Sequence, residues 1–320
     1  MIRRAQVLFM GIIAIATGAP STAQAASTVS GGVDLRALHS TAPSGTEAEF
    51  AGAFLNLRQV WADTSGDRWI GVAQLDFDRN FEDVHPYQAY LRYKGPLGKW
   101  NILAGHFLLP FGLLANYDTE RLLLQGIETT NLGIRTDTGA QLFGRSGDWD
   151  YAVSLTDGLS NSRLFDDDAR PVLTTRVAYV KEVWQVGFSA LAGRVWSRFE
   201  PLTGEANDSG AVARERRFAL DALRVWGPLT LRAEASAGTN NGERVWGGVL
   251  LADYAIAPKL ELNFRYAIWR PLFTNQTVGA GLTYEVGHGF FVRIADNYEL
   301  TGMKNNALTT QLYFEFSHRI

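Results

Sequence analysis

The feature that most constrains the fold is the division of the chain, from residue 29 onward, into runs of about 10 to 13 residues in which apolar and polar side chains alternate. Successive side chains of a β-strand point to opposite faces, so each run predicts a strand with one apolar and one wet face. We count sixteen such runs: 29–39, 49–62, 68–80, 87–95, 100–110, 134–146, 149–158, 170–182, 184–198, 215–227, 229–238, 245–257, 259–270, 277–287, 290–300 and 307–320.

The connections between these runs alternate between short and long. The short set carries the glycine, proline, aspartate and serine residues that favour tight turns. The short connections are Thr64-Ser65-Gly66-Asp67, Gly95-Pro96-Leu97-Gly98, Ser146-Gly147-Asp148, Gly227-Pro228, Pro258-Lys259 and Gly287-His288-Gly289. The longer connections are 40–48, 81–86, 111–133, 159–169, 199–214, 239–244, 271–276 and 301–306. This alternation is typical of transmembrane barrels, which have short periplasmic turns and longer external loops.

The two faces of single runs support the same fold. In the run 259–270, Leu260, Leu262 and Phe264 alternate with Glu261 and Asn263. Lipid outside and water inside satisfy both faces, and closure leaves no strand edge unpaired in lipid. We therefore predict an all-β protein, a closed antiparallel transmembrane β-barrel of about 16 strands, because about 9–11 tilted residues cross a bilayer.

The first 25 residues have the pattern of a secretory signal peptide. Arg3 and Arg4 precede a short apolar core, and Ala23-Gln24-Ala25 is a small-x-small cleavage site. We expect cleavage after Ala25, which leaves a single barrel domain at 26–320. After these 25 residues the sequence has no run of about 18 apolar residues, so no transmembrane helix is predicted. The expected location is the outer membrane of a Gram-negative bacterium, with membrane lipid around the barrel.

Composition narrows the possible functions further. The formal charge is −3, which argues against a nucleic-acid partner, and the chain has no cysteine, which excludes disulfides and thiolate chemistry. No pair among the five histidines has the spacing of a metal site. Ser317 and His318 are adjacent, so on a strand they face opposite ways and form no catalytic dyad. We expect no cofactor and no enzymatic activity.

Gly105-His106-Phe107-Leu108-Leu109-Pro110-Phe111-Gly112 resembles the G-x-F-x-x-P-F-G segment of the phosphate-selective porin O/P-like family. Gly139-Ala140-Gln141-Leu142-Phe143-Gly144, followed by Tyr151, is similar to the next hairpin of that family. The resemblance covers about 50 residues. It implies a 16-stranded porin, a homotrimer, and a third external loop that folds inward. Phosphate selectivity does not carry over, because the loop 111–133 has no lysine.

The connection 111–133 is the longest in the chain, and its leucines predict that it folds into the lumen. A short helix at 118–125 would pack Leu122, Leu123 and Leu124 against the barrel wall. The other interpretation is a charged loop on the outer surface. For an inward loop, the candidates for a pore constriction are Asp118, Glu120, Arg121, Glu128, Arg135 and, as a lone histidine that is easily incidental, His106.

Alternation also assigns charged residues to the lumen wall. The bases are Arg58, Arg92, Lys94, Arg176, Arg232, Arg265 and Arg293, and the acids are Asp76, Asp78, Asp137, Glu234, Glu261, Glu285, Glu299 and Glu315. Basic and acidic walls that face each other would create a transverse field across the pore. The alternative is a set of cross-strand ion pairs without a selective role.

Together these patterns favour a porin that lets small hydrophilic solutes or ions diffuse passively through a constricted, water-filled pore. The alternative hypothesis is a structural sleeve around a partner such as a multihaem cytochrome in transmembrane electron transfer. An inward loop argues against the sleeve, because it would occupy the space that such a partner needs.

Overall fold

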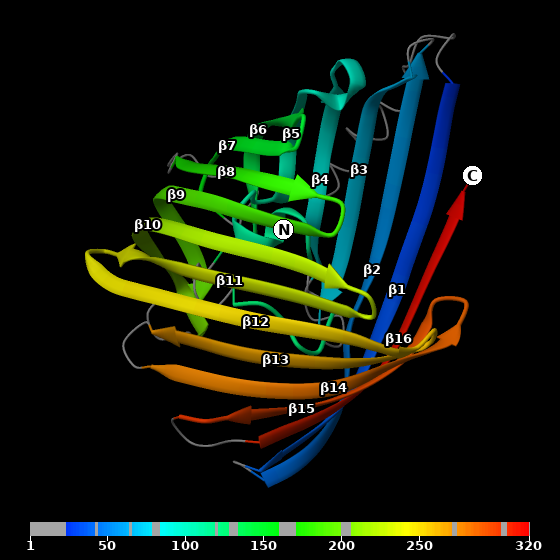
Figure 1. The fold of residues 1–320 in the computed structure, drawn as a ribbon, viewed down its shortest axis with the longest axis vertical. Coiled ribbons are helices and arrows are strands. Elements are labelled where there is room, and N and C mark those ends of the chain that lie inside the picture. The colour runs from blue at the N-terminus through cyan, green and yellow to red at the C-terminus, as the bar shows by residue number, and fades with distance from the viewer. Residues whose placement is uncertain are drawn as a thin grey trace.

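The computed structural model describes residues 24–41, 44–63, 66–78, 84–118, 121–127, 134–159, 171–199, 206–270, 274–301 and 306–319. Sixteen antiparallel strands form one closed barrel, in which each strand pairs with its neighbours in sequence and β1 pairs with β16 (Figure 1). The predicted fold class is confirmed. The first eight strands are β1 (Gln24–Thr41), β2 (Ser44–Asp63), β3 (Gly66–Asp78), β4 (Val84–Lys94), β5 (Asn101–Leu108), β6 (Thr136–Ser146), β7 (Trp149–Thr156) and β8 (Val172–Lys181).

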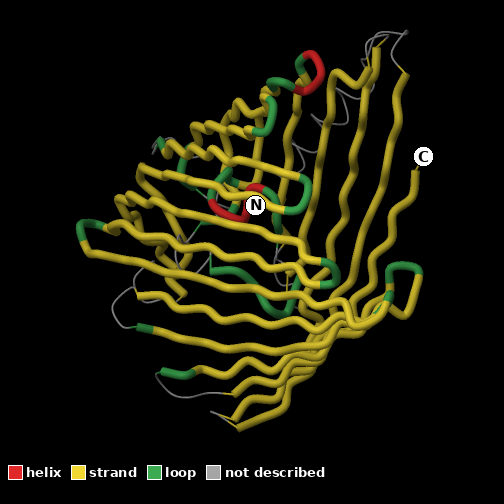
Figure 2. The backbone as a smooth tube through the Cα atoms, viewed as in Figure 1, coloured by secondary structure: helices red, strands yellow, loops and turns green. Residues whose placement is uncertain are grey.

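The second half continues the meander with the same antiparallel pairing. Its strands are β9 (Trp184–Phe199), β10 (Ala206–Trp226), β11 (Leu229–Asn240), β12 (Glu243–Ala257), β13 (Leu260–Arg270), β14 (Asn275–Gly287), β15 (Phe290–Glu299) and β16 (Asn306–Arg319). Strands make up most of the described chain, and two short 3-10 helices cover Pro96–Gly98 and Gly112–Ala115 (Figure 2). In that part of the chain, no helix is long and apolar enough to cross a membrane.

The outer face of the barrel is apolar. Leu155, Phe218, Leu220 and Val177 expose 46–60% of their surface there, while their sequence neighbours point inward. Two aromatic clusters stand near short turns, and edge or tilted ring contacts of 4.9–5.5 Å join their members. The clusters are Trp69–Tyr93–Trp100 and Trp149–Tyr179–Trp184.

Several connections predicted to be long are short, because the strands continue in pairs beyond the expected ends. The β1–β2 hairpin pairs as far as Thr41 with Ser44, inside the predicted connection 40–48. The β11–β12 hairpin turns at Asn241 and Gly242, whose φ angles of 48° and 94° are both positive. Positive φ at both positions suits a tight type I′ turn, for which Asn-Gly is a preferred sequence.

Strand lengths differ strongly around the barrel. β2 has 20 residues and β10 has 21, whereas β5 and β7 have 8 each. The short strands lie where the chain leaves the wall after Leu108 and returns at Thr136 (Figure 1). β1 begins at Gln24, two residues before the predicted mature start, and residues 1–23 lie outside the described part of the chain.

Candidate functional site

The inner face of the barrel is identified by its alternation with exposed apolar side chains. On β10, Phe218 and Leu220 are exposed, whereas Arg217, Ala219 and Asp221 are buried. The same alternation on β8 and β9 turns Val172, Arg176, Ser189 and Leu191 inward. Charged and apolar side chains therefore share the lumen side, and the connection between β5 and β6 contacts both kinds.

The connection begins with an apolar anchor on β8–β10. Leu109 and Phe111 are at most 1% exposed, and they form one cluster with Ile134 and with inward-facing residues of these strands. The wall residues of this cluster are Val172, Leu191, Val195 and Ala219. A second cluster joins Leu113 and Ile127 to Val249, Leu251 and Ala267 of β12 and β13. These contacts place both ends of the described connection against lumen-facing residues.

Gly112 fixes the chain between the two clusters. Its φ of 53° lies in the left-handed region, and a Cβ at this position would come within 2.1 Å of Oε2 of Glu234. The Gly112 amide donates to Oγ of Ser189 at 3.0 Å, and the Leu113 amide donates to the same Glu234 Oε2 at 2.7 Å. The lumen-wall prediction for Glu234 thus corresponds to a carboxylate that binds the backbone of the connection.

Arg121 attaches the connection to the other side of the barrel. Its guanidinium donates to Asp76 of β3 at 2.5 Å and lies over the ring of Phe54 on β2, 5.3 Å from the ring centroid. Its carbonyl accepts bonds from Arg293 of β15 at 3.4 Å and from Gln311 of β16 at 3.2 Å. One residue thus joins the connection to four strands.

Asp118 lies beside Tyr87 of β4 and beside Arg135, which comes just before β6. Its Oδ2 accepts a bond from the Tyr87 hydroxyl at 2.8 Å, and its Oδ1 is 3.8 Å from Nη1 of Arg135. Strict alternation along β4 would place Tyr87 on the outer face with Ala89. A β-bulge instead shifts the β3–β4 register between Gln74 and Leu75, and the Tyr87 hydroxyl reaches Asp118.

The remaining constriction candidates are placed differently. His106 is 1% exposed, and its two ring nitrogens lie 2.9 Å and 3.1 Å from the hydroxyls of Thr138 and Thr136. It offers no surface to a pore, so its prediction as a constriction residue is wrong; threonines of the neighbouring strand supply partners for its ring instead. Glu120 and Glu128 lie outside the described residues. The described residues 121–127 form no helix, contrary to the expected helix at 118–125.

Many of the predicted wall charges are paired or hydrogen bonded. Arg176 of β8 bonds Asp221 of β10 at 2.6 Å, across Gly187 of β9, where a Cβ would collide with both side chains. Arg92 donates to Asn101 at 2.9 Å and lies over the ring of Phe143, which turns it toward the lumen. Arg58 is exposed on the lumen side of β2, where Phe54 also points inward. Lys94 and Arg265 lie on the inward rows of β4 and β13.

Two predicted acids have other environments. Asp137 is fully buried, and it accepts the backbone amides of Gly158 and Leu159 at 2.8 and 3.1 Å. Its neighbour Asp157, just beyond β7, has its pKa raised to about 8, first by burial and then by a hydrogen bond with Asp137. The side chain of Asp78 lies outside the described part of the chain.

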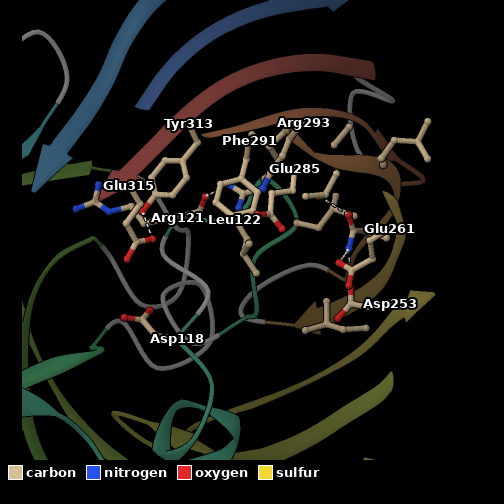
Figure 3. Close-up of a pocket in the computed structure, with 18 of the residues that line it drawn as sticks. Asp118, Arg121, Leu122, Asp253, Glu261, Glu285, Phe291, Arg293, Tyr313 and Glu315 are labelled. Atoms are coloured by element: carbon tan, nitrogen blue, oxygen red, sulfur yellow. Dashed lines mark hydrogen bonds between the residues drawn. The ribbon is translucent and has the colours of Figure 1, made fainter. Parts of the chain in front are cut away.

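Beside the connection lies a cavity of about 720 Å³, lined by Tyr117–Leu124 as far as these residues are described and by inward residues of β11–β16 and β1–β4. Figure 3 shows Glu315 and Asp118 on one side of it and Glu261 and Asp253 on the other, with Glu285 and Leu122 between them. Leu122, Leu123 and Leu124 all line this space, and the side chain of Leu124 also lies against Gly279 of β14.

Several residues of the cavity were not predicted from the sequence. Asp253 of β12 forms an ion pair with Arg232, and Tyr117 lies under the Arg232 guanidinium at 3.9 Å. Tyr313 of β16 also lines the cavity and donates to Glu315 at 3.2 Å. Asp253 follows the alternation of Val249 and Leu251, so the same pattern would have found it. Among the described residues, no group of histidine, aspartate and glutamate side chains could hold a metal ion.

Comparisons with known proteins give similarity at the level of the fold. No family model and no curated protein sequence matches the chain. The trimer form of in-vitro folded OmpT, an outer membrane protein of Vibrio cholerae, is 10% identical with a TM-score of 0.68, over 92% of this chain and 100% of that one. An anion-selective porin from Comamonas acidovorans is 11% identical with a TM-score of 0.68, over 92% and 100%.

OmpF of Salmonella typhi, solved in complex with daunomycin, is 13% identical with a TM-score of 0.66, over 91% of this chain and 97% of that one. The resemblance to the phosphate-selective family therefore has no family-model support. What the comparisons do show is that the chain has the fold of outer-membrane barrels, porins among them.

Proposed function

We propose that the protein is an integral porin of a Gram-negative outer membrane, through which small hydrophilic solutes or ions diffuse passively. The observation that carries this proposal is the cavity of about 720 Å³ inside a closed barrel, bordered by charged side chains on its wall. An apolar outer face and a polar interior are what a water-filled barrel in lipid requires. The similar folds of solved porins support the same conclusion.

In this proposal the connection 111–133 folds into the lumen and forms the constriction, with Asp118, Arg121 and Arg135 at its described part. Contacts to β8–β10 on one side and to β2, β3, β15 and β16 on the other support a segment that crosses the barrel. Such a segment leaves little room for a partner protein, so the porin is favoured over the cytochrome sleeve. The barrel would assemble as a homotrimer, as the trimer form of the Vibrio protein does.

The test is single-channel current of the purified, folded protein in a planar lipid bilayer. Steady current steps are expected, because a wet passage conducts ions without energy coupling. Heat-modifiable migration on a gel would show independently that the protein used is folded. Folded protein that inserts into the bilayer and carries no current would overturn the porin proposal. The fraction of trimer in the same preparation is measured by chemical cross-linking.

A further inference from the structure

We propose that this passage selects for cations, and that Glu261, Glu285 and Glu315 are the residues that select. The inference deepens the proposed porin function and rests on it. The three glutamates come from β13, β14 and β16, and all line the cavity beside the connection (Figure 3). The class of solute that this site would favour is small hydrophilic cations.

Three arginines line the cavity, and aromatic rings cover all of them. Each has aromatic cover: Arg232 lies over Tyr117 at 3.9 Å, Arg121 over Phe54 at 5.3 Å, and Arg293 over Phe291 and Tyr313 at 5.0 Å each. Stacking on a ring covers one face of a guanidinium and holds it against the wall. The positive groups are thus fixed to the wall of the passage.

The same three arginines also form ion pairs or hydrogen bonds with residues of the wall. Arg121 is paired with Asp76 at 2.5 Å, Arg232 is paired with Asp253, and Arg293 donates to Oε1 of Gln311 at 2.9 Å. The side chains of Arg121 and Arg232 are 21% and 15% exposed, and Arg293 is 9% exposed. Two of the three positive charges therefore have a carboxylate partner, and all three offer little surface to a passing ion.

The glutamates have a different environment. Glu261 accepts a bond from Asn263 at 2.6 Å, and Glu315 accepts one from the Tyr313 hydroxyl at 3.2 Å. Both partners are uncharged, so neither cancels the carboxylate charge. Among the described residues, the carboxylate of Glu285 has no hydrogen-bond or ion-pair partner. Glu315 is exposed, and Glu261 and Glu285 are partly exposed.

One more base lines the cavity and opposes the glutamates. Lys259 stands in the turn between β12 and β13, and its ammonium donates to the Val286 carbonyl at 3.4 Å. It is a single exposed charge at one end of the passage, whereas the three glutamates come from three strands. Low-dielectric walls focus the field of such uncompensated charges into the passage. The resulting potential attracts cations and repels anions.

The experiment measures the reversal potential in a planar bilayer under a KCl gradient. For the unmodified protein, the dilute side is expected to become positive, the sign of cation selectivity. The variant E261Q/E285Q/E315Q should lower the permeability ratio of K⁺ to Cl⁻ by about threefold, since each carboxylate acts through water at a distance near the Debye length. The single variant E285Q should lower it in the same direction by a smaller factor.

The matched control removes three glutamates outside the cavity. Glu47, Glu182 and Glu243 are exposed, so E47Q/E182Q/E243Q changes the net charge equally without touching the passage. Its permeability ratio should stay that of the unmodified protein. An anion-selective unmodified protein, or a ratio that changes equally in both triple variants, would overturn the inference and leave the porin intact. Absence of current in every variant would instead overturn the porin proposal itself.

If the variant E261Q/E285Q/E315Q fails to fold, the single variant E285Q still tests the inference. Because the Glu285 carboxylate bonds to no described residue, this substitution removes no side-chain bond from the described part of the barrel. A folded E285Q protein whose permeability ratio equals that of the unmodified protein contradicts a selective role for Glu285.

Discussion

The connection between β5 and β6 meets two very different walls. Toward β8–β10 and β12–β13 it is packed as in a protein core, with Leu109, Phe111, Leu113 and Ile127 each at most 6% exposed. Toward β2, β3, β15 and β16 it is held by the polar groups of Arg121 and borders the charged cavity. We refer to these as the packed side and the charged side.

In the proposed porin, this difference would let the barrel both hold a segment in its lumen and remain filled with water. Burial of apolar side chains supplies non-directional stabilisation, which suits an anchor that excludes water. Ion pairs and hydrogen bonds are directional, so they fix the position of Arg121 beside the cavity. In the proposed porin, the packed side would keep the segment inside the barrel, and the charged side would set how the part around Arg121 lies beside the passage.

The largest expected effect comes from removing the packed side. Phe111→Ala deletes a ring that is 1% exposed, and a cavity of this kind costs about 3–5 kcal/mol. Since the barrel wall stays closed, the loss should detach the connection and not unfold the strands. We expect higher single-channel conductance, and faster trypsin cleavage after Arg121 as measured by mass spectrometry of the folded protein.

The matched control is Phe218→Ala, which removes the same ring from the outer face of β10, where it is 57% exposed. Its conductance and its cleavage after Arg121 should equal those of the unmodified protein. Equal cleavage in Phe111→Ala and Phe218→Ala would show that the packed side does not anchor the connection.

A smaller effect is expected from the charged side. Arg121→Gln removes the ion pair with Asp76, and a hydrogen bond to a charged group contributes about 1.5–3 kcal/mol. The part of the connection around Arg121 should then fluctuate, while the packed side still anchors the rest of the connection. Current noise should therefore rise more than mean conductance. The control Arg145→Gln removes an exposed pair with Asp150 at 3.4 Å and should leave the noise unchanged.

A double-mutant cycle with Asp76→Asn separates the pair from other effects of Arg121. If the two residues act together, the stability loss of the double variant, measured by urea unfolding, should be smaller than the sum of the single losses. Additive losses would mean that Arg121 positions this part of the connection through its carbonyl contacts alone.

The sequence predicts the barrel well because lipid on one face of a strand and water on the other require apolar and polar residues to alternate. The sequence also contains a signal for the packed side. Leu191 and Val195 on β9 and Val249 and Leu251 on β12 are apolar residues on the inward row, where β10 carries the charged residues Arg217 and Asp221. Apolar residues that face the lumen are expected to be covered by another segment of the protein. In this chain they lie on strands that the connection between β5 and β6 contacts.

Other parts of the site have no such local signal. The position of Tyr87 depends on a β-bulge, and the residue types along β4 do not reveal where the bulge lies. Burial of His106 depends on hydroxyls from β6, and a histidine on an alternating run looks the same with or without them. The long β1–β2 pairing exceeds the apolar alternation, because its far end is exposed on both faces.

The smallest expected effect concerns two carboxyls outside both sides, Asp137 on β6 and Asp157 just beyond β7. Asp157 has its pKa raised from 3.8 to about 8, because it is partly buried and bonded to Asp137. The unfolded chain loses this proton near its usual pKa, whereas the folded protein keeps it until about pH 8. The contribution of the group to stability is thus complete below the unfolded pKa and is lost as the pH rises through 8.

Urea unfolding in detergent, followed by tryptophan fluorescence, should therefore show lower stability at about pH 9 than at about pH 5, and Asp157→Asn should reduce this difference. The control is Asp148→Asn in the exposed turn after β6. A hydrogen bond from Lys181 lowers the pKa of Asp148, so its contribution is already complete at pH 5 and does not change above it. If the Asp157→Asn protein keeps the full difference in stability between about pH 5 and about pH 9, then a group other than Asp157 causes this pH dependence.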